Sequence, residues 1–166
     1  GYATRFGVLY PMQTFSKDRL VDFKSIPCFI EASDSKTLEC IQSLALSISE
    51  KVYMLSSHDR KYLHLSAVFA CNFVNHCYEI AAEILHQHDI PFEVLQPLID
   101  ETARKIHMLS PRDAQTGPAV RYDKNVIEAQ RKLLADSLLW QEIYETMSES
   151  IHRTAITNKP NRYDKL

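Results

Sequence analysis

The alternation of apolar and polar positions from Ser56 to His88 predicts one long helix. No Gly or Pro interrupts this stretch before Pro91. Ser56 or Ser57 can cap the first amides, and Asp59 suits the positive N-terminal end of a helix. At 1.5 Å per residue such a helix spans on the order of 45 Å, about the width of a small domain. We therefore expect it to be the spine of the chain.

Apolar residues cover most of the circumference of this predicted helix, a pattern typical of a helix packed on several sides. Polar residues fall within one arc of roughly a quarter turn at 100° per residue: His64, Asn72, Asn75, Glu79 and His86. One interpretation is a polar stripe that lines a ligand-binding cleft. The alternative is that the stripe faces solvent, or that neighbouring helices satisfy its hydrogen bonds.

Three short apolar runs before the spine predict strands, at residues 6–10, 27–31 and 51–55. An amphipathic helix, capped by Ser33 or Asp34, separates the second strand from the third. Strand, helix and strand in this order predict a βαβ crossover in a parallel sheet. Because three strands and one helix cannot cover both faces of a sheet, we expect either a partner chain or the tail of a larger α/β domain.

Further helices are predicted after the spine. One runs from Asp89 and Pro91 to Ile106 with a bend near Pro97, and a structured loop follows at residues 110–123. Asp123 or Asn125 then caps another helix, and a last helix covers about residues 136–152. Its apolar residues are expected to point inward: Leu138, Leu139, Ile143, Met147 and Ile151. Residues 154–166 read as a polar, frayed tail.

Composition narrows the classes of function. The 166 residues carry a net charge of −2, so bulk electrostatics give no argument for a nucleic-acid partner. The four cysteines lie in predicted strands or helices without a CxxC pair, which predicts buried thiols in a reducing cytoplasm. No signal peptide and no apolar run of about 18 residues is present, so we predict a cytoplasmic chain with no membrane segment.

Glycine is scarce, with only three residues in the chain. A phosphate-binding loop needs several glycines, so the chain contains neither a P-loop nor a GxGxxG turn. Metal chemistry is not expected either. His86 and His88 are two residues apart and point to different faces of a helix, and no HExxH motif occurs.

Three motifs then point to a family. In chain order they are Tyr10-Pro11-Met12-Gln13-Thr14-Phe15, the spine run from His64 to Phe73, and Thr116-Gly117-Pro118-Ala119-Val120-Arg121-Tyr122-Asp123. Together they resemble a bacterial family of Rossmann-like NAD(P) oxidoreductases that carry a C-terminal helical domain of unknown function, of the 2520 type. The plan is similar to pyrroline-5-carboxylate reductase, to prephenate dehydrogenase and to the helical domain of the 6-phosphogluconate dehydrogenase superfamily. The resemblance covers nearly the whole chain.

The resemblance implies a mainly α fold in which a small α/β part precedes a helical domain. Residues 1–55 would be the last strands of a Rossmann-like NAD(P)-binding domain whose front half is missing. Residues 56–153 would form the dimerising helical domain, and residues 154–166 a polar tail. In such enzymes the substrate lies between the two domains, next to the nicotinamide.

The same resemblance implies site residues. The catalytic candidates are His64 and Asn72; the substrate-binding candidates are Asn75, Thr116, Arg121 and Asp123; the cofactor-binding candidates are Pro11, Gln13 and Thr14. His64 could protonate a carbonyl or imine, because an unperturbed histidine titrates near neutrality. Arg121 could bind a carboxylate or a phosphate.

Each of these roles has a structural alternative. His64 could hydrogen-bond a neighbouring helix, and Asn72 could form a buried amide bond between helices. Arg121 could pair at the surface with Asp123 or Asp113. Thr116 and Gly117 could simply form a turn in which the glycine supplies a positive φ.

Two positions depart from the family pattern: Tyr10 stands where the family commonly has His, and Tyr122 where it commonly has Gly. We expect the C-terminal fragment of an NAD(P)-dependent reductase or dehydrogenase of a small keto or imino substrate. NADP or NAD would bind the full-length protein, and no cofactor is expected in this chain alone. The expected partner is a second copy of the chain. The alternative is a non-enzymatic helical dimerisation or interaction domain.

Overall fold

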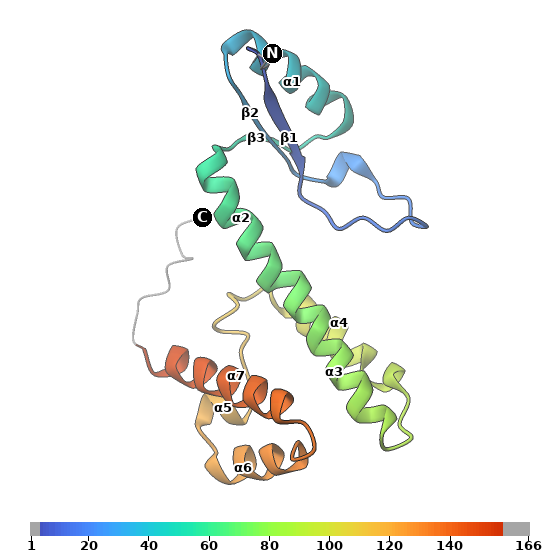
Figure 1. Ribbon diagram of the computed structural model, residues 1–166, viewed down its shortest axis with the longest axis vertical. Helices are drawn as coiled ribbons and strands as arrows, with labels where there is room; N and C mark the ends of the chain where they lie inside the picture. Colours follow the sequence, from blue (N-terminus) through green and yellow to red (C-terminus); the bar gives the residue numbers. More distant parts are fainter. Residues whose placement is uncertain (1–3, 158–166) are drawn as a thin grey trace. The chain divides into compact units, whose positions relative to one another are not determined.

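The computed structural model describes residues 4–157, which form a mainly helical fold with one small three-stranded sheet (Figure 1). The predicted fold class is thereby confirmed. The chain divides into two compact units, Gly1–Asn75 and His76–Leu166, and each is described by itself below. This division falls within the predicted spine, and the assignment of residues 1–55 to a Rossmann-like domain stays a prediction.

The sheet consists of β1 (Gly7–Pro11), β2 (Cys28–Ala32) and β3 (Val52–Met54) in the order β1-β2-β3. β1 runs antiparallel to β2, whereas β2 and β3 are parallel. Helix α1 (Ser35–Ile48) connects the parallel pair. The predicted βαβ crossover is therefore confirmed, and the short 3-10 helix η1 (Phe23–Ser25) lies in the connection between β1 and β2.

The core of this unit lies between the sheet and α1, which contacts all three strands (Figure 1). Cys28 and Ile30 alternate along β2 and are completely or almost completely buried, as is Ala45 on the facing side of α1. Asp34 caps α1 by accepting a hydrogen bond from the Thr37 amide. The alternating strand pattern and the cap explain why these residues fold as predicted.

The spine is helical throughout but is not one regular α-helix. It consists of α2 (Ser57–Ala67), a π-helical segment (Val68–Phe73) and α3 (Val74–His86). Ser56 caps α2 through a hydrogen bond from the Asp59 amide, as one of the two predicted options requires. Because π-helical residues turn by less than 100° each, the predicted quarter-turn arc does not hold across this segment.

The expectation of a spine packed on several sides is wrong for this chain. Leu65, Phe69 and Phe73 keep about half or more of their side-chain surface exposed. All five residues of the predicted polar stripe are also exposed, as the solvent-face alternative requires.

Burial of the cysteines was predicted correctly at one position. Cys28 is buried, whereas Cys40, Cys71 and Cys77 are exposed free thiols. These three lie on helix surfaces that this chain leaves uncovered, so the interpretation of all four as core residues is wrong. The cytoplasmic location inferred from them stays a prediction.

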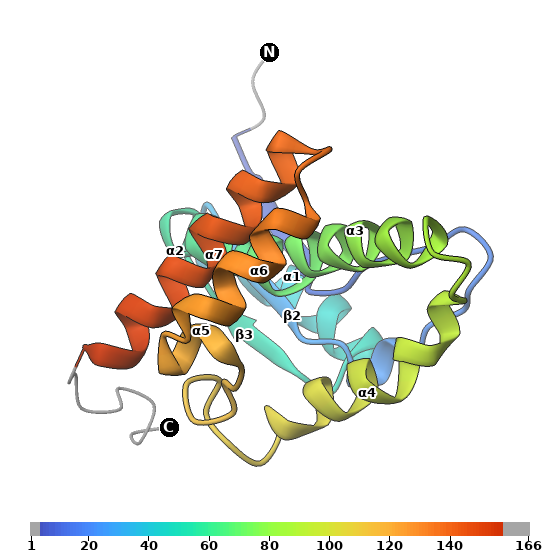
Figure 2. The same ribbon diagram turned by 90° about the horizontal axis from the view of Figure 1, so that it is seen from below.

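The second unit continues with η3 (Phe92–Leu95), α4 (Gln96–Lys105), α5 (Pro118–Arg121), α6 (Lys124–Leu133) and α7 (Leu138–Ile156). Pro97 stands in the first turn of α4, so it starts this helix instead of bending it. α5, α6 and α7 lie side by side (Figures 1 and 2), and Ala119 of α5 is buried among them.

Helix α7 runs further than the sequence suggested. Residues 154–156 are helical, Thr157 is the C-cap of the helix, and residues 158–166 of the predicted tail lie outside the described residues. Leu138, Leu139 and Met147 are half exposed or more, so they do not point into a core of this chain as expected. Among the described helices, none has the length and hydropathy needed to cross a membrane.

Candidate functional site

A tyrosine and a histidine meet at the end of the first strand. Tyr10 is the fourth residue of β1, and its hydroxyl lies 3.1 Å from Nδ1 of His64 on α2. His64 is exposed and Tyr10 is partly exposed, so the pair is accessible to a ligand. A neutral imidazole can accept a hydrogen bond at Nδ1 while it donates one from Nε2. The pair is thus an acid–base group held against the sheet.

A polar cluster fixes α2 to the sheet and so positions His64. The Glu31 carboxylate at the end of β2 accepts hydrogen bonds from the Ser57 hydroxyl at 2.5 Å and from the Arg60 guanidinium at 3.0 Å. Arg60 also donates to the Ser57 hydroxyl at 2.8 Å. The hydrogen bonds from Ser57, and then the charge and hydrogen bond of Arg60, lower the pKa of Glu31. Three side chains therefore join the start of α2 to the central strand.

The cofactor-binding candidates follow directly after Tyr10. Pro11 is the last residue of β1 and pairs with Cys28, whereas Gln13 and Thr14 are exposed. The Gln13 side-chain oxygen accepts a hydrogen bond from the Thr14 amide at 2.8 Å. Cofactor-binding roles for Pro11, Gln13 and Thr14 stay predictions. A glycine-rich turn for the pyrophosphate is not among the residues of this chain.

The two asparagine candidates lie further along the spine. Asn72 belongs to the π-helical segment and Asn75 to α3, and both side chains are exposed. The alternative of a buried amide bond at Asn72 is therefore wrong for this chain. π-helical turns are common at functional sites, although on their own they identify no ligand.

Two local features predicted for the segment before α6 are present in the structure. Gly117 has φ +111° and ψ 177°, which confirms the turn with a positive φ. Asp123 caps α6, because its carboxylate accepts a hydrogen bond from the Val126 amide at 3.3 Å. Thr116 is exposed, and so is Arg121, which forms no ion pair with Asp123. The role of Arg121 in binding a ligand stays a prediction.

Tyr122 has a role that the candidate set missed. It adopts a left-handed conformation with φ 54° and ψ 46°, which a glycine adopts without strain. Its ring stacks on His152 of α7 with centroids 4.0 Å apart, and the Lys124 ammonium lies 5.1 Å from its centroid. The departure from the family glycine at this position was the available signal. The stack fastens the loop to α7.

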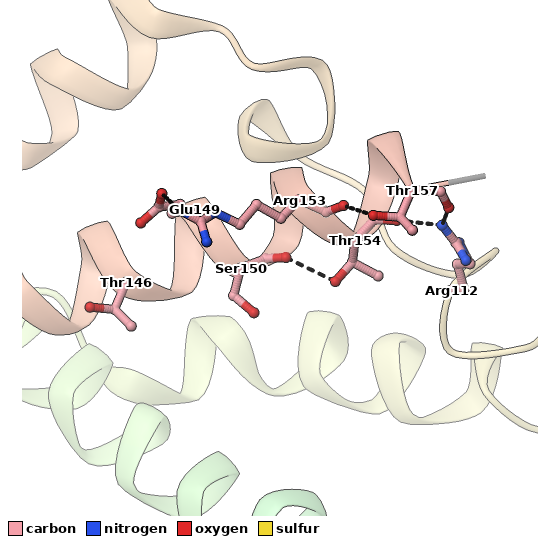
Figure 3. A pocket seen from close by; sticks show the side chains of 7 residues that line it. All are labelled: Arg112, Thr146, Glu149, Ser150, Arg153, Thr154 and Thr157. Carbon is pink, nitrogen blue, oxygen red and sulfur yellow. Dashed lines mark hydrogen bonds and ion pairs between the residues drawn. The ribbon is translucent and has the colours of Figure 1, made fainter. Parts of the chain in front are cut away.

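A pocket of about 520 Å³ beside α7 was also not foreseen. Seven residues line it (Figure 3): Arg112, Thr146, Glu149, Ser150, Arg153, Thr154 and Thr157. The Arg112 guanidinium donates to the carbonyl oxygens of Thr154 and Thr157, and Arg153 pairs with Glu149 at 2.5 Å. Arg112 thus binds two carbonyl oxygens at the C-terminal end of α7, whereas the Arg153–Glu149 pair lies within this helix.

The structure therefore brings Tyr10 and His64 together in the first unit, whereas in the second unit Thr116 precedes α5, Arg121 ends it and Asp123 follows it. Catalytic roles for His64 and Asn72 stay predictions. Within residues 4–157, no group of three or more His, Cys, Asp or Glu side chains lies close enough to hold a metal ion.

Comparison with known proteins identifies the family of this chain. The sequence model of one protein family, Domain of unknown function (DUF2520), matches residues 26–151. The chain is similar to a solved structure from Bacteroides fragilis, a proposed NADP oxidoreductase named BF3122, with 54% identity and a TM-score of 0.89, over 92% of this chain and 59% of that one. It shares the fold of protein TM1727 from Thermotoga maritima, with 23% identity and a TM-score of 0.76, over 90% of this chain and 61% of that one. This chain thus spans about three-fifths of these two relatives. No curated protein matches it. Since the family model covers well over half of its residues, the chain belongs to the DUF2520 family.

Proposed function

We propose that this chain is the substrate-binding part of an NADP-dependent oxidoreductase that reduces a small keto or imino compound. The accessible Tyr10–His64 pair at the end of β1 carries the proposal, because a strand end next to an acid–base group is suited to reduction of a polarised double bond. The name of the Bacteroides relative, a proposed NADP oxidoreductase, supports the cofactor class.

In this proposal His64 is the proton donor. Its Nε2 forms no hydrogen bond with the described residues, so it can face a carbonyl oxygen or an imine nitrogen. A bound reduced nicotinamide would supply the hydride to the carbon of the same double bond. Asn72 and Asn75, both exposed on the spine, would hold the polar groups of the substrate.

The loop of the second unit would recognise the charge of the substrate. Arg121 is exposed and has a planar guanidinium that matches a carboxylate in a bidentate manner. Gly117, with its positive φ, and the Asp123 cap fix the loop on either side of α5. We therefore place Thr116 and Arg121 among the substrate-binding residues, with Asp123 supporting them.

A homodimer is part of the proposal, since the spine exposes Leu65, Phe69 and Phe73 to solvent in a single chain. NADP would bind the full-length protein and not this chain alone, because the chain has no glycine-rich turn. Calorimetric titration of the 166-residue chain with NADPH should give no heat of binding. Micromolar affinity for NADPH would contradict the proposal that this chain alone does not bind the cofactor.

The main experiment uses the full-length protein and a panel of keto and imino acids, with NADPH oxidation as the readout. His64→Asn should lower kcat by roughly 10²–10⁴-fold, the usual contribution of a general acid. His58→Asn is the matched control, because the His58 side chain lies on the same helix, is 74% exposed, and has local contacts with Asp59 and with the Tyr62 ring. Its kcat should be unchanged.

The competing function is a non-enzymatic helical dimerisation or interaction domain. It would explain the exposed apolar spine equally well. Full activity of the His64→Asn variant would contradict the proposed role of His64 as the proton donor. Failure of every substrate in the panel to oxidise NADPH would favour the interaction domain.

A further inference from the structure

We infer that Tyr10 is a positioning residue for His64: its hydroxyl donates to Nδ1 and so keeps the ring proton of the neutral imidazole on Nε2. The importance of this contact for catalysis rests on the proposed function, but the tautomer of His64 can be measured without it. The observation is the 3.1 Å contact between two residues that are 54 positions apart in the chain.

We propose this direction of the hydrogen bond because the phenol O–H is a better donor than the imidazole N–H, and an imidazole nitrogen is a better acceptor than a phenol oxygen. A phenol has one proton to donate, and a neutral imidazole has one nitrogen that must accept. The tautomer of a histidine is set by the partner of its other nitrogen. Donation from Tyr10 to Nδ1 therefore leaves Nε2–H, which can donate to a carbonyl oxygen or an imine nitrogen.

The surrounding contacts keep this geometry in place. β1 holds Tyr10 in register opposite Phe29 of β2, and the Glu31 cluster holds the first turn of α2 against the end of the same strand. Both partners are thus fixed to β2 through independent contacts. His64 can therefore keep its contact with Tyr10 through Nδ1 while the residue as a whole stays exposed.

The test is the tautomer of His64 in the 166-residue chain, measured from two-bond ¹H–¹⁵N correlations of the ring at a pH where the imidazole is neutral. We expect the Nε2–H form in the wild type. Tyr10→Phe, which removes only the hydroxyl, should lower the ratio of Nε2–H to Nδ1–H by about two- to tenfold, as expected for the loss of one hydrogen bond. Tyr53→Phe on β3 is the control and should leave the ratio unchanged.

An Nδ1–H form in the wild type, or an unchanged ratio in Tyr10→Phe, would overturn the inference. The measurement needs no substrate and no cofactor, so its outcome is independent of the proposed reductase activity. If Tyr10→Phe changes the tautomer ratio but the full-length protein shows no activity, only the proposed function is contradicted. If the full-length protein is active but Tyr10→Phe leaves the tautomer ratio unchanged, only the role of Tyr10 is contradicted.

Discussion

Gly117 has a backbone conformation, φ +111° and ψ 177°, that is essentially restricted to glycine. A Cβ at this position would meet no heavy atom within 4 Å, so replacement is opposed by backbone strain and not by a clash. Gly117→Ala should therefore lower the free energy of unfolding by about 1–3 kcal/mol. Urea denaturation checks this value. A change below about 0.5 kcal/mol would show that the loop adapts.

Ser49 is a buried polar side chain, 2% exposed, in the core of the first unit. Its hydroxyl donates to the Ile26 carbonyl at 2.6 Å and accepts from the Lys51 amide at 3.0 Å. Ser49→Ala leaves both backbone groups without this partner and should cost about 1–3 kcal/mol in urea denaturation. Ser47→Ala is the control. Its exposed hydroxyl bonds only within the helix, to the Leu44 carbonyl, so its effect should be close to zero. Equal effects of the two changes would contradict the role of Ser49.

At the scale of elements, the junction between β2 and α2 depends on the ionised Glu31 carboxylate. The hydrogen bonds from Ser57 and the neighbouring Arg60 lower its pKa in the folded chain. The unfolded chain then binds the proton more readily, so this contribution to stability is complete above the ordinary glutamate pKa of 4.5 and is lost as pH falls through the lowered value.

Glu31→Gln should therefore reduce stability near neutral pH and flatten the loss of stability below pH 4.5, since the group that titrates is gone. Denaturation midpoints recorded from neutral to acidic pH measure this. Glu39→Gln, an exposed change on α1, is the control and should keep the wild-type profile. A Glu31→Gln profile parallel to the wild type would contradict the junction.

Elements that depend on interactions between residues close together in the chain could be predicted from the sequence, whereas the others could not. The Asp34, Ser56 and Asp123 caps bind amides three residues along the chain, so local residues were sufficient to predict them. The π-helical segment differs from an α-helix only in the hydrogen-bond partner of each amide, which the apolar pattern does not encode.

The candidate site shows the same limit. His64 was identified from its residue type and its place on the spine, but its partner Tyr10 is 54 residues away and comes from another element. The stack of Tyr122 on His152 is equally non-local. Such contacts depend on how a helix packs on a strand or on another helix, which a single sequence does not specify.

At the scale of the whole molecule, few apolar residues among residues 4–157 are buried, and many large ones are exposed in both units. The buried apolar residues of this range are Ile26, Cys28, Ile30, Ala45 and Ala119. Apolar surface of this extent is typical of chains that bury it against a partner. A second copy of the chain is the partner that we propose, with the spine as the shared surface.

The spine offers a direct test of this dimer. Phe69 is 62% exposed and packs edge-to-face on Phe73, with centroids 4.9 Å apart, so an aromatic pair stands on the proposed surface. Light scattering should give twice the chain mass of 19.2 kDa at micromolar concentration. A charge at this position would be desolvated in the dimer, so Phe69→Glu should raise Kd by roughly 30-fold or more, equivalent to at least about 2 kcal/mol. Leu44→Glu, at an exposed position on α1, should leave the dimer intact. If Leu44→Glu dissociated the dimer and Phe69→Glu did not, the shared surface would be α1 and not the spine. A monomeric wild type would contradict the proposed dimer itself.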